Sequence, residues 1–408
     1  MLRLIHTADW HLGHTLHGFD RHWEHQRFLQ WLLETIVTRQ VDVLLVAGDI
    51  FHTANPSNAA MTLYFQFIAD LCRHAPQVQI ILTAGNHDSP LRLESSADLL
   101  SVLGVRVVGS MPYSRQDYDK IVIPMRNATG EVEAWCGAVP FLRLADLPVQ
   151  ADEEDVAGGV AAVYAQVWQA LQHNRQPGQG VVLTGHCYMA GGDLSEWSER
   201  KILLGNQHAL PVAMFGEEVA YVALGHLHLA QRVGGRERVR YSGSPIPMSM
   251  QERGYRHQVL LVEMEGEQVQ EITPLPVPRS VEFLKIPQQG GVTLDELLPL
   301  LAQLPEGQQN ERSPYLEVVV KATTAEMVTR QRIEEALLNK GVRLVKITLQ
   351  RPGQETVSKP FSTANLVDLA AEEIFKRKYQ QHYGQEPPND WLAAFHELVD
   401  AADQEEAG

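Results

Sequence analysis

Five segments of this chain share one pattern: an apolar run of strand length ends at a glycine or another small residue, and polar side chains follow at once. The runs and the residues after them are 2–5 with Asp9 and His11, 41–46 with Gly48-Asp49, 78–82 with Gly85-Asn86-His87-Asp88, 181–183 with Gly185-His186, and 219–224 with Gly225-His226-Leu227-His228. Because the runs are continuously apolar and do not alternate, they predict strands buried on both faces, as in a sheet covered by helices.

Helical segments are predicted between the first three strands. Apolar residues recur at helical spacing in two sets, which are Trp23, Phe28, Trp31, Leu32 and Ile36, and then Met61, Tyr64, Phe65, Ile68 and Leu71. The order strand, helix, strand predicts an α/β sandwich, and α/β sheets bind ligands beyond the carboxyl ends of their strands. The polar residues follow those ends, so we expect them to converge on one site.

The pattern changes after a proline-rich segment at 274–278, which is typical of a linker. We therefore predict a first domain over 1–275 and a small α/β domain over 280–350. Its strands are expected at 281–286, 316–320 and 342–347, and its helices at 294–301 and 327–338. A polar linker at 351–360 leads to two short amphipathic helices within 361–402. A chain of 408 residues is long enough for these domains.

Cysteine content and hydropathy exclude several classes of protein. The chain has 3 cysteines, Cys72, Cys136 and Cys187, at wide spacings. This argues against a disulfide framework and against a thiolate zinc site. The first residues lack the apolar core of a signal peptide, and no run approaches the roughly 18 apolar residues of a membrane span. We predict a soluble, cytoplasmic protein.

The formal net charge of −16 is unfavourable for a protein that binds nucleic acid, because phosphate contacts need Lys and Arg. Two considerations weaken this objection. Divalent cations held by clustered carboxylates reverse the local charge. Acidic residues also gather in stretches that a polyanion need not approach, such as 152–155 and the tail from Asp403.

The strand-end residues are suitable metal ligands. They offer oxygen and imidazole donors without a thiolate, a set that suits Mn, Fe or Mg-like ions, with zinc possible. The candidates are Asp9, His11, Asp49, Asn86, His186, His226 and His228. Seven groups exceed the four that one tetrahedral ion needs, and they fit two adjacent metals that share a carboxylate. Two ions ~3.5–4 Å apart clamp a phosphate and activate water for in-line attack. Asp49 is the natural bridge because it follows a central strand.

Each element also has an ordinary structural interpretation. A single histidine at a strand end is usually a hydrogen-bonded loop residue, and an isolated Gly-Asp is usually a turn. The glycines before Asp49, Asn86, His186 and His226 are suited to tight turns and to close backbone approach. Five such elements in order, all at strand ends, are hard to explain as independent turns, so we favour the metal site.

The same motifs resemble the signature of the calcineurin-like metallophosphoesterases, which implies a four-layer α/β sandwich. Within that superfamily they are most similar to the SbcD-type nucleases, bacterial relatives of the nuclease that repairs double-strand breaks. Three further stretches carry this likeness, namely His11-Leu12-Gly13, Ala47-Gly-Asp-Ile-Phe51 and Tyr241-Ser-Gly-Ser-Pro-Ile-Pro247. The resemblance is strong over residues 1–275 and extends by layout to the end of the chain.

The resemblance implies roles for individual residues. One metal would be held by Asp9, His11, Asp49 and His228, and the other by Asp49, Asn86, His186 and His226. His87 corresponds to the catalytic histidine, which stabilises the transition state and protonates the leaving oxygen; imidazoles titrate near neutral pH, which suits that task. Asp88 either orients His87 by a hydrogen bond or caps a turn.

Other residues near the motifs have weaker signals. His52 follows Gly-Asp-Ile-Phe and is a candidate phosphate contact. His14, His17, His22 and His25 are mostly expected to be solvated loop or helix residues. The arginines at 232, 236, 238 and 240 flank Gly234-Gly235 and predict a charged hairpin. Arg143, Arg253 and Arg256 could meet backbone phosphates, which positions DNA without reading its sequence.

The family resemblance further implies a manganese-dependent nuclease with two divalent ions, acting in DNA repair, recombination and replication. It would be an exonuclease on double-stranded ends and an endonuclease on single strands and hairpin DNA. The 280–350 domain would be a capping domain that holds DNA.

The C-terminal helix pair would dock on an SbcC-type coiled-coil ATPase. That partner would bind the ATP, since this chain has no Gly-x-x-x-x-Gly-Lys loop. Packing of that pair on its own nuclease domain is the alternative. Segments near 61–65 and 91–93 would form a homodimer contact within a heterotetramer, or belong to the core.

Two rival functions remain open. One is another enzyme of the same fold, a small-molecule phosphodiesterase or a protein phosphatase. The other is a non-enzymatic scaffold whose metal site is vestigial. The small second domain and terminal helices argue against the first rival, and the complete ligand set with His87 argues against the second.

Overall fold

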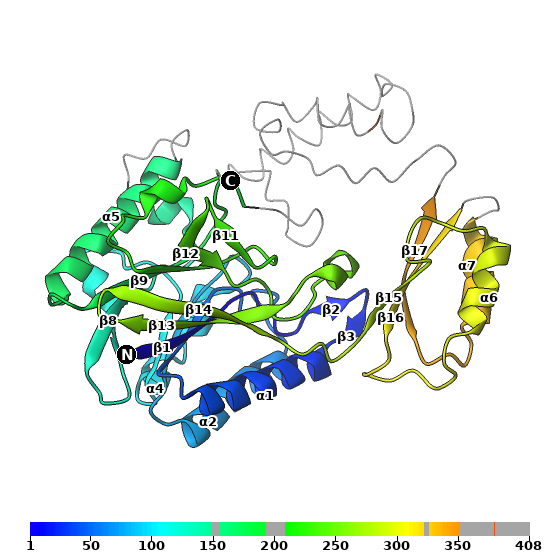
Figure 1. The fold of residues 1–408 in the computed structure, drawn as a ribbon, viewed down its shortest axis with the longest axis horizontal. Helices are drawn as coiled ribbons and strands as arrows, with labels where there is room; N and C mark the ends of the chain where they lie inside the picture. Colours follow the sequence, from blue (N-terminus) through cyan, green and yellow to red (C-terminus); the bar gives the residue numbers. More distant parts are fainter. Residues whose placement is uncertain (149–155, 193–208, 322–325, 351–378, 380–408) are drawn as a thin grey trace. The chain divides into compact units, whose positions relative to one another are not determined.

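A computed structural model describes residues 1–148, 156–192, 209–321, 326–350 and Tyr379 (Figure 1). The chain divides into two compact units, 1–352 and 353–408. The predicted C-terminal helix pair and the acidic stretches at 152–155 and from Asp403 lie outside the described residues. No helix among the residues described is long and apolar enough to span a bilayer.

The first sheet contains three of the five predicted strands. Its order is β14 (Gln268–Pro276), β13 (Gln258–Glu265), β1 (Leu2–Thr7), β4 (Val43–Ala47), β5 (Gln79–Thr83) and β6 (Val105–Val108). Strands β1, β4, β5 and β6 run parallel, whereas β13 is antiparallel to β1 and β14 is antiparallel to β13. The parallel register brings the ends of β1, β4 and β5 to the same edge.

The second sheet is also mixed and contains the other two predicted strands. Its order is β11 (Gln231–Val233), β12 (Arg236–Tyr241), β10 (Tyr221–Gly225), β9 (Gly180–His186), β8 (Val132–Gly137) and β7 (Val122–Arg126). Strands β9 and β10 are parallel neighbours, so His186 and Gly225 are paired at their ends. The arginine-rich segment forms the predicted hairpin, β11 and β12.

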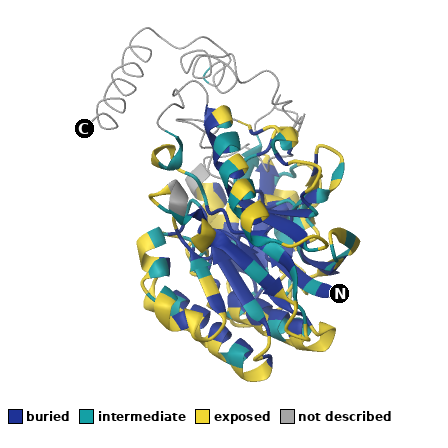
Figure 2. Cartoon of the chain, turned by 90° about the vertical axis from the view of Figure 1, so that its left-hand side faces the viewer, coloured by how far each residue is buried: buried dark blue, intermediate teal, exposed yellow. Residues whose placement is uncertain are grey.

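Side-chain alternation divides the core into two layers. Leu4 and Leu45 face a hydrophobic cluster shared with the second sheet and α5 (Val156–Asn174), whereas Ile5 and Leu44 face a cluster built with two helices. Those helices, α1 (His22–Arg39) and α2 (Asn58–His74), confirm the predicted helical segments and pack side by side (Figure 1). The strands are buried and the outer helix faces are exposed (Figure 2).

The remaining elements among the described residues up to 276 are short. They are β2 (Thr15–Leu16), β3 (Phe19–Asp20), α3 (Pro90–Glu94), α4 (Ala97–Ser101) and four 3₁₀ helices, η1 (Arg115–Ile121), η2 (Leu144–Asp146), η3 (Val212–Met214) and η4 (Met250–Gly254). Strands β2 and β3 form a small hairpin.

The predicted small α/β domain is present. It comprises β15 (Phe283–Ile286), α6 (Leu294–Ala302), β16 (Tyr315–Lys321), α7 (Glu326–Ala336) and β17 (Arg343–Gln350), with the strands parallel. Helix α6 starts at a capping box between Thr293 and Glu296, which satisfies the free N–H groups of its first turn. A separate apolar cluster joins this domain to β2 and η4 through contacts of Leu16 and Met250 with Phe283 and Tyr315.

Candidate metal centre

The loops that follow the strands are joined by backbone hydrogen bonds. Asp9 N–H donates to the Gly48 carbonyl at 3.0 Å, and His11 N–H donates to the Asp49 carbonyl at 3.0 Å. The loops after β1 and β4 therefore form one unit. His226 N–H, after β10, donates to the Asp9 carboxylate at 2.9 Å, which ties the second sheet to the first.

Backbone conformation at the candidate ligands is unusual. Asp9, His11, Asp49 and His226 have φ values of 55°, 46°, 52° and 104°. Positive φ is uncommon for residues other than glycine, and such conformations cluster at functional sites where the surrounding structure enforces them. All four of these side chains are buried at the strand ends.

Two of the predicted glycines are required by close packing at the centre. A Cβ atom on Gly85 would overlap Asp49, and one on Gly48 would overlap the His186 ring. At these two positions the atoms that approach the glycine belong to the side chains of other candidate ligands. The expected approach of the backbone to ions or phosphate stays a prediction.

A first group of buried side chains meets where β1 and β10 end. Ligand atoms of Asp9, His11 and His228 all lie within 4.8 Å of one another. His11 Nε2 is 3.2 Å from His228 Nε2 and 3.6 Å from Asp49 Oδ2. Two imidazoles and the Asp9 carboxylate thus come together, and Asp49 lies next to His11.

A second group meets where β4, β5 and β9 end. His186 Nε2 lies 3.3 Å from Asp49 Oδ2 and 3.0 Å from Asn86 Oδ1. His226 Nδ1 lies 3.1 Å from the same Asn86 oxygen. Asp9 joins Asp49 and His186 in a second set within 4.8 Å, so both aspartates lie between the two groups.

The donor chemistry of the second group fits a cation. His186 Nδ1 lies 2.9 Å from the Ala47 carbonyl oxygen, so this nitrogen carries the proton. In a neutral imidazole, Nε2 then presents a lone pair to the oxygens of Asn86 and Asp49, which are themselves acceptors. A positive charge at this point, either an added proton or a metal ion, would relieve the repulsion between Nε2 and the Asp49 carboxylate.

The pKa values of these groups also indicate that a positive charge is favoured at this point. Burial alone would lower the pKa of His186, but the charge of Asp49 beside it raises that pKa to about 9. Burial opposes charge on Asp49 as well, yet His186 holds the Asp49 pKa well below its usual range. Burial raises the pKa of Asp9 to about 7 and lowers that of His226 to about 3. Asp49 therefore favours a positive charge beside it, which a bound metal ion would also supply.

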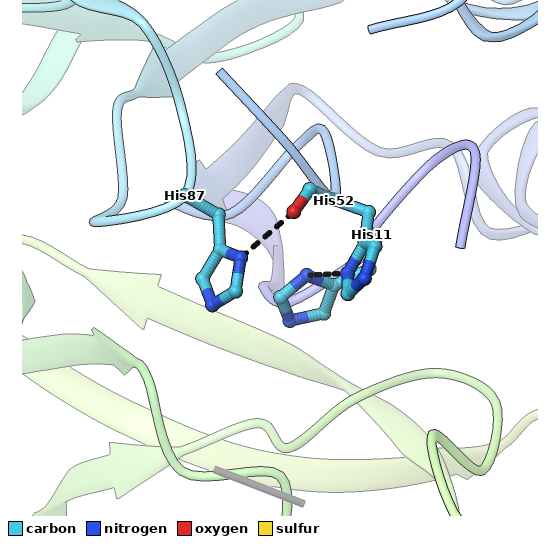
Figure 3. A group of neighbouring side chains, drawn as sticks. All are labelled: His11, His52 and His87. Atoms are coloured by element: carbon cyan, nitrogen blue, oxygen red, sulfur yellow. Dashed lines mark hydrogen bonds between the residues drawn. The ribbon is translucent and has the colours of Figure 1, made fainter. Parts of the chain in front are cut away.

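His87 lies beside this centre together with His52 (Figure 3). His87 Nδ1 donates to the His52 carbonyl at 2.8 Å, and His87 N–H donates to Asp49 Oδ1 at 2.8 Å. The rings of His52 and His87 stack with centroids 5.5 Å apart, and His52 Nδ1 is 3.5 Å from His11 Nδ1. The carbonyl of His52, which no sequence pattern marks, is the group that orients the His87 ring.

Asp88 faces backbone amides. Its carboxylate accepts hydrogen bonds from the N–H groups of Gly85 at 2.8 Å, Phe51 at 2.8 Å and Ile50 at 3.1 Å. Burial, followed by the nearby charge of Asp49, raises the pKa of Asp88 to about 6. Of the two roles left open by the sequence, these contacts favour turn capping, here between the loops after β4 and β5.

Glu252 is a neighbour of the centre that no sequence motif marks. Its Oε1 lies 3.1 Å from His228 Nδ1, and the residue is fully buried. It follows an irregular segment with neither strand nor helix periodicity, so no sequence signal places it there.

The neighbouring histidines have different environments. His14 is half-buried, edge-on to the His52 ring, and its Nδ1 lies 3.3 Å from an Arg21 nitrogen. His25 lies in α1, as expected, and is buried there, which the sequence did not indicate. His22, which begins that helix, and His17 are exposed.

The candidate DNA-contacting arginines mostly have partners within the protein. The four hairpin arginines pair with Glu217 or Glu237, which supports the interpretation as a charged hairpin. Arg143 lies over the Phe141 ring, and Arg253 donates to the Met250 carbonyl.

Comparisons with known proteins agree with this site. Residues 2–230 match the family model of calcineurin-like phosphoesterases, and residues 279–383 match that of the type 5 capsule protein repressor C-terminal domain. The chain is 39% identical to the D subunit of the SbcCD nuclease of Rhodobacter capsulatus, over 86% of this chain and 88% of that protein. It is 32% identical to the Escherichia coli K12 protein of the same name over 92% of both chains, and 29% identical to that of Bacillus subtilis strain 168 over the full length of both.

Proposed function

The chain belongs to the calcineurin-like phosphoesterase family, as a metal-dependent nuclease of the SbcD type, and we propose that it hydrolyses DNA phosphodiester bonds with two divalent cations. One observation carries this proposal: two buried groups of imidazoles and carboxylates meet with Asp49 between them. The two mixed sheets with helices on their outer faces are the framework that holds them, and we assign this arrangement to the family's four-layer sandwich.

We assign Asp9, His11, Asp49 and His228 to one cation and Asp49, Asn86, His186 and His226 to the other. Burial supports this assignment, because charged groups inside a protein need a counter-charge. Manganese suits the mixed oxygen and nitrogen donors. When bound, the two cations supply Lewis-acid activation of the scissile phosphate and of the attacking water.

His87 is the proposed proton donor. Its Nδ1 is engaged by the His52 carbonyl, so Nε2 is the atom left to face the substrate. This hydrogen bond fixes the ring orientation before substrate arrives, and a positioned imidazole accelerates proton transfer by roughly 10²–10⁴-fold. The half-buried ring of His52, stacked on His87, is placed to contact the same phosphate.

Further parts of the proposal concern DNA and partners. We propose a nuclease domain over 1–275, a DNA-holding capping domain over 280–350 and a segment, 361–402, that binds an SbcC-type coiled-coil ATPase. Double-stranded ends would be degraded exonucleolytically, and single strands and hairpin DNA would be cut internally, in DNA repair, recombination and replication. The names of the relatives, which are D subunits of SbcCD nucleases, support SbcC as the partner.

A homodimer contact is proposed on the helical face of the nuclease domain. Apolar side chains are exposed there, notably Leu91 at 82% and Leu99 at 73%. Phe65, which borders a shallow hollow on α2, is 36% exposed. These exposed apolar side chains on α2, α3 and α4 are the support for an interface.

The main experiment replaces His87 by alanine and measures manganese-dependent cleavage of hairpin-ended DNA. We expect bound manganese to be retained, because His87 is outside the proposed ligand set, and cutting to fall by at least about 10²-fold. Unchanged cutting would show that His87 has no part in the chemistry.

A second candidate function is that of a small-molecule phosphodiesterase with the same centre. Comparing turnover of a chromogenic phosphodiester with cleavage of hairpin DNA separates the two functions. The nuclease proposal requires the DNA to be the better substrate in kcat/KM.

A further inference from the structure

Glu252 occupies a position that the reaction proposed above does not explain. It lies in η4, outside all the strand-end motifs, and its side chain is 0% exposed. A buried carboxylate is costly unless it is hydrogen-bonded or paired, so its contacts indicate why it is there. Oε2 accepts a hydrogen bond from Met248 N–H at 2.7 Å, and Oε1 lies 3.1 Å from His228 Nδ1.

The contact with His228 sets which ring nitrogen carries the proton. Nδ1 faces a carboxylate oxygen, which can only accept, so Nδ1 must be the protonated nitrogen. Nε2 then holds a lone pair, and this is the atom that lies 3.2 Å from His11 Nε2 inside the first ligand group. A carboxylate behind a histidine fixes both its tautomer and its ring orientation for metal binding.

The loop that carries Met248 is held in place by a buried arginine. Arg21, which is 1% exposed, donates to the Pro247 carbonyl, one residue before Met248. The Arg21 guanidinium is held by both oxygens of Glu24, at 2.8 and 2.7 Å. The backbone that donates to the Glu252 carboxylate is thus anchored by a buried ion pair beside it.

From this geometry we propose that Glu252 is a positioning residue, which presents His228 Nε2 to a divalent cation and sets how tightly the centre holds that cation. The inference rests on the proposed metal centre. The competing explanation is purely structural, in which Glu252 only caps the loop through Met248 N–H.

The test measures manganese affinity of the full chain by calorimetric titration, with thermal unfolding in EDTA as the folding control. Glu252→Gln keeps the shape and an acceptor for Met248 N–H, but turns an N–H₂ donor toward His228 Nδ1. That contact favours the opposite tautomer, with Nε2–H pointing into the centre. We expect manganese to bind roughly 10–100-fold more weakly. Glu252→Asp keeps a carboxylate and should lose less.

A matched control and a double variant isolate the mechanism. Glu317→Gln changes another buried carboxylate, in β16, and should leave manganese affinity unchanged. In a His228→Ala background, Glu252→Gln should have no further effect, because its action passes through that ring.

The outcomes separate the two levels of proposal. If the wild-type chain fails to bind two manganese ions, the metal centre itself is wrong. If the wild type binds them and whichever Glu252 variant folds binds equally well, the positioning role is overturned. A loss of affinity that is the same with and without His228 also overturns it.

Discussion

Buried polar side chains of this protein hold loops and imidazole rings in place by hydrogen bonds, and replacing one acceptor atom by a donor would break such a bond. Asp88 shows this most clearly, because a single carboxylate accepts from three backbone amides in two loops. Those loops carry Asp49 and Asn86, so the same residue that caps the turns also sets the separation of two candidate ligands.

Asp88→Asn is expected to destabilise the protein although it preserves shape. An amide has one acceptor oxygen, so at least one of the three N–H groups would face an N–H₂ donor. A buried donor left without an acceptor costs about 1–3 kcal/mol. Urea unfolding in EDTA measures this cost. Asp98→Asn, at an exposed position in α4, is the matched control and should be neutral. Equal stability of both variants would contradict the capping role.

His6 is a buried histidine outside the proposed ligand set. In β1 it spans to the second sheet, with Nδ1 2.9 Å from the Tyr221 hydroxyl and Nε2 3.2 Å from the Leu224 carbonyl oxygen. Burial lowers its pKa to about 3, against the opposing effect of the Leu224 carbonyl. The folded protein therefore keeps His6 neutral at a pH where the unfolded chain binds a proton.

The sign of the resulting pH dependence follows. Above pH 6.5, the pKa of His6 in the unfolded chain, this residue has no effect on stability. As the pH falls from 6.5 toward 3, His6 lowers the free energy of unfolding by about 1.4 kcal/mol per pH unit, because only the unfolded chain binds the proton. His6→Gln should reduce the slope of unfolding free energy against pH by that amount between pH 6 and pH 5 in EDTA. His74→Gln, on the exposed end of α2, should leave the slope unchanged. Parallel slopes for wild type and His6→Gln would contradict the interpretation.

At the scale of elements, the strands that could be predicted from the sequence are those whose apolar run is followed by a recognisable polar motif. Strands β1, β4, β5, β9 and β10 are continuous apolar runs that end in ligand-like residues, and all were predicted. Strand β7 contains Pro124, which weakens a strand pattern, and β2 and β3 are too short for any periodicity. Helix α5, with Gly158-Gly159 near its start, also went unpredicted.

The candidate site divides in the same way. The strand-end motifs were predictable because parallel strands bring their carboxyl ends to one edge. Glu252 and the His52 carbonyl act through loop geometry, which depends on the complete fold. The shared position of Asp9 between both ligand groups also depends on φ values that no sequence pattern encodes.

The contact between the small α/β domain and the first domain contains a buried ion pair. Tyr315 in β16 donates to Glu24 Oε1 at 2.7 Å, while Arg21 holds both Glu24 oxygens and lies 5.9 Å from the Tyr315 ring centroid. A buried pair gains little over apolar residues of similar volume, but removing one partner strands a charge.

Arg21→Met should therefore destabilise the protein by roughly 3–5 kcal/mol, because Glu24 is left buried without its cation. Tyr315→Phe removes one hydrogen bond from a pair that stays intact and should cost about 0.5–1.5 kcal/mol. Arg21→Met combined with Glu24→Met should recover much of the loss. Urea unfolding ranks the three, with Tyr113→Phe at an exposed position as control. A double variant no more stable than Arg21→Met would contradict the stranded-charge explanation.

For the whole molecule, the formal net charge of −16 has to be reconciled with a polyanionic substrate. The hairpin arginines that could have offset it are paired with glutamates, and the centre itself gathers carboxylates. Without cations, a phosphate at this centre would meet repulsion, and DNA affinity should therefore depend on the metal beyond general screening.

This dependence can be measured with the His87→Ala chain, which should bind DNA and cut it at least about 10²-fold more slowly than the wild type. We expect hairpin DNA to bind roughly tenfold or more tightly in manganese than in EDTA, since a charge-assisted contact contributes about 1.5–3 kcal/mol. Manganese also screens DNA directly, so the matched control is His87→Ala with Asp49→Asn at the same manganese concentration. That chain lacks the shared carboxylate, so manganese should increase its DNA affinity far less. Fluorescence anisotropy at fixed ionic strength reports both affinities, and an equal gain in the two chains would place the manganese effect on the DNA and not at the centre.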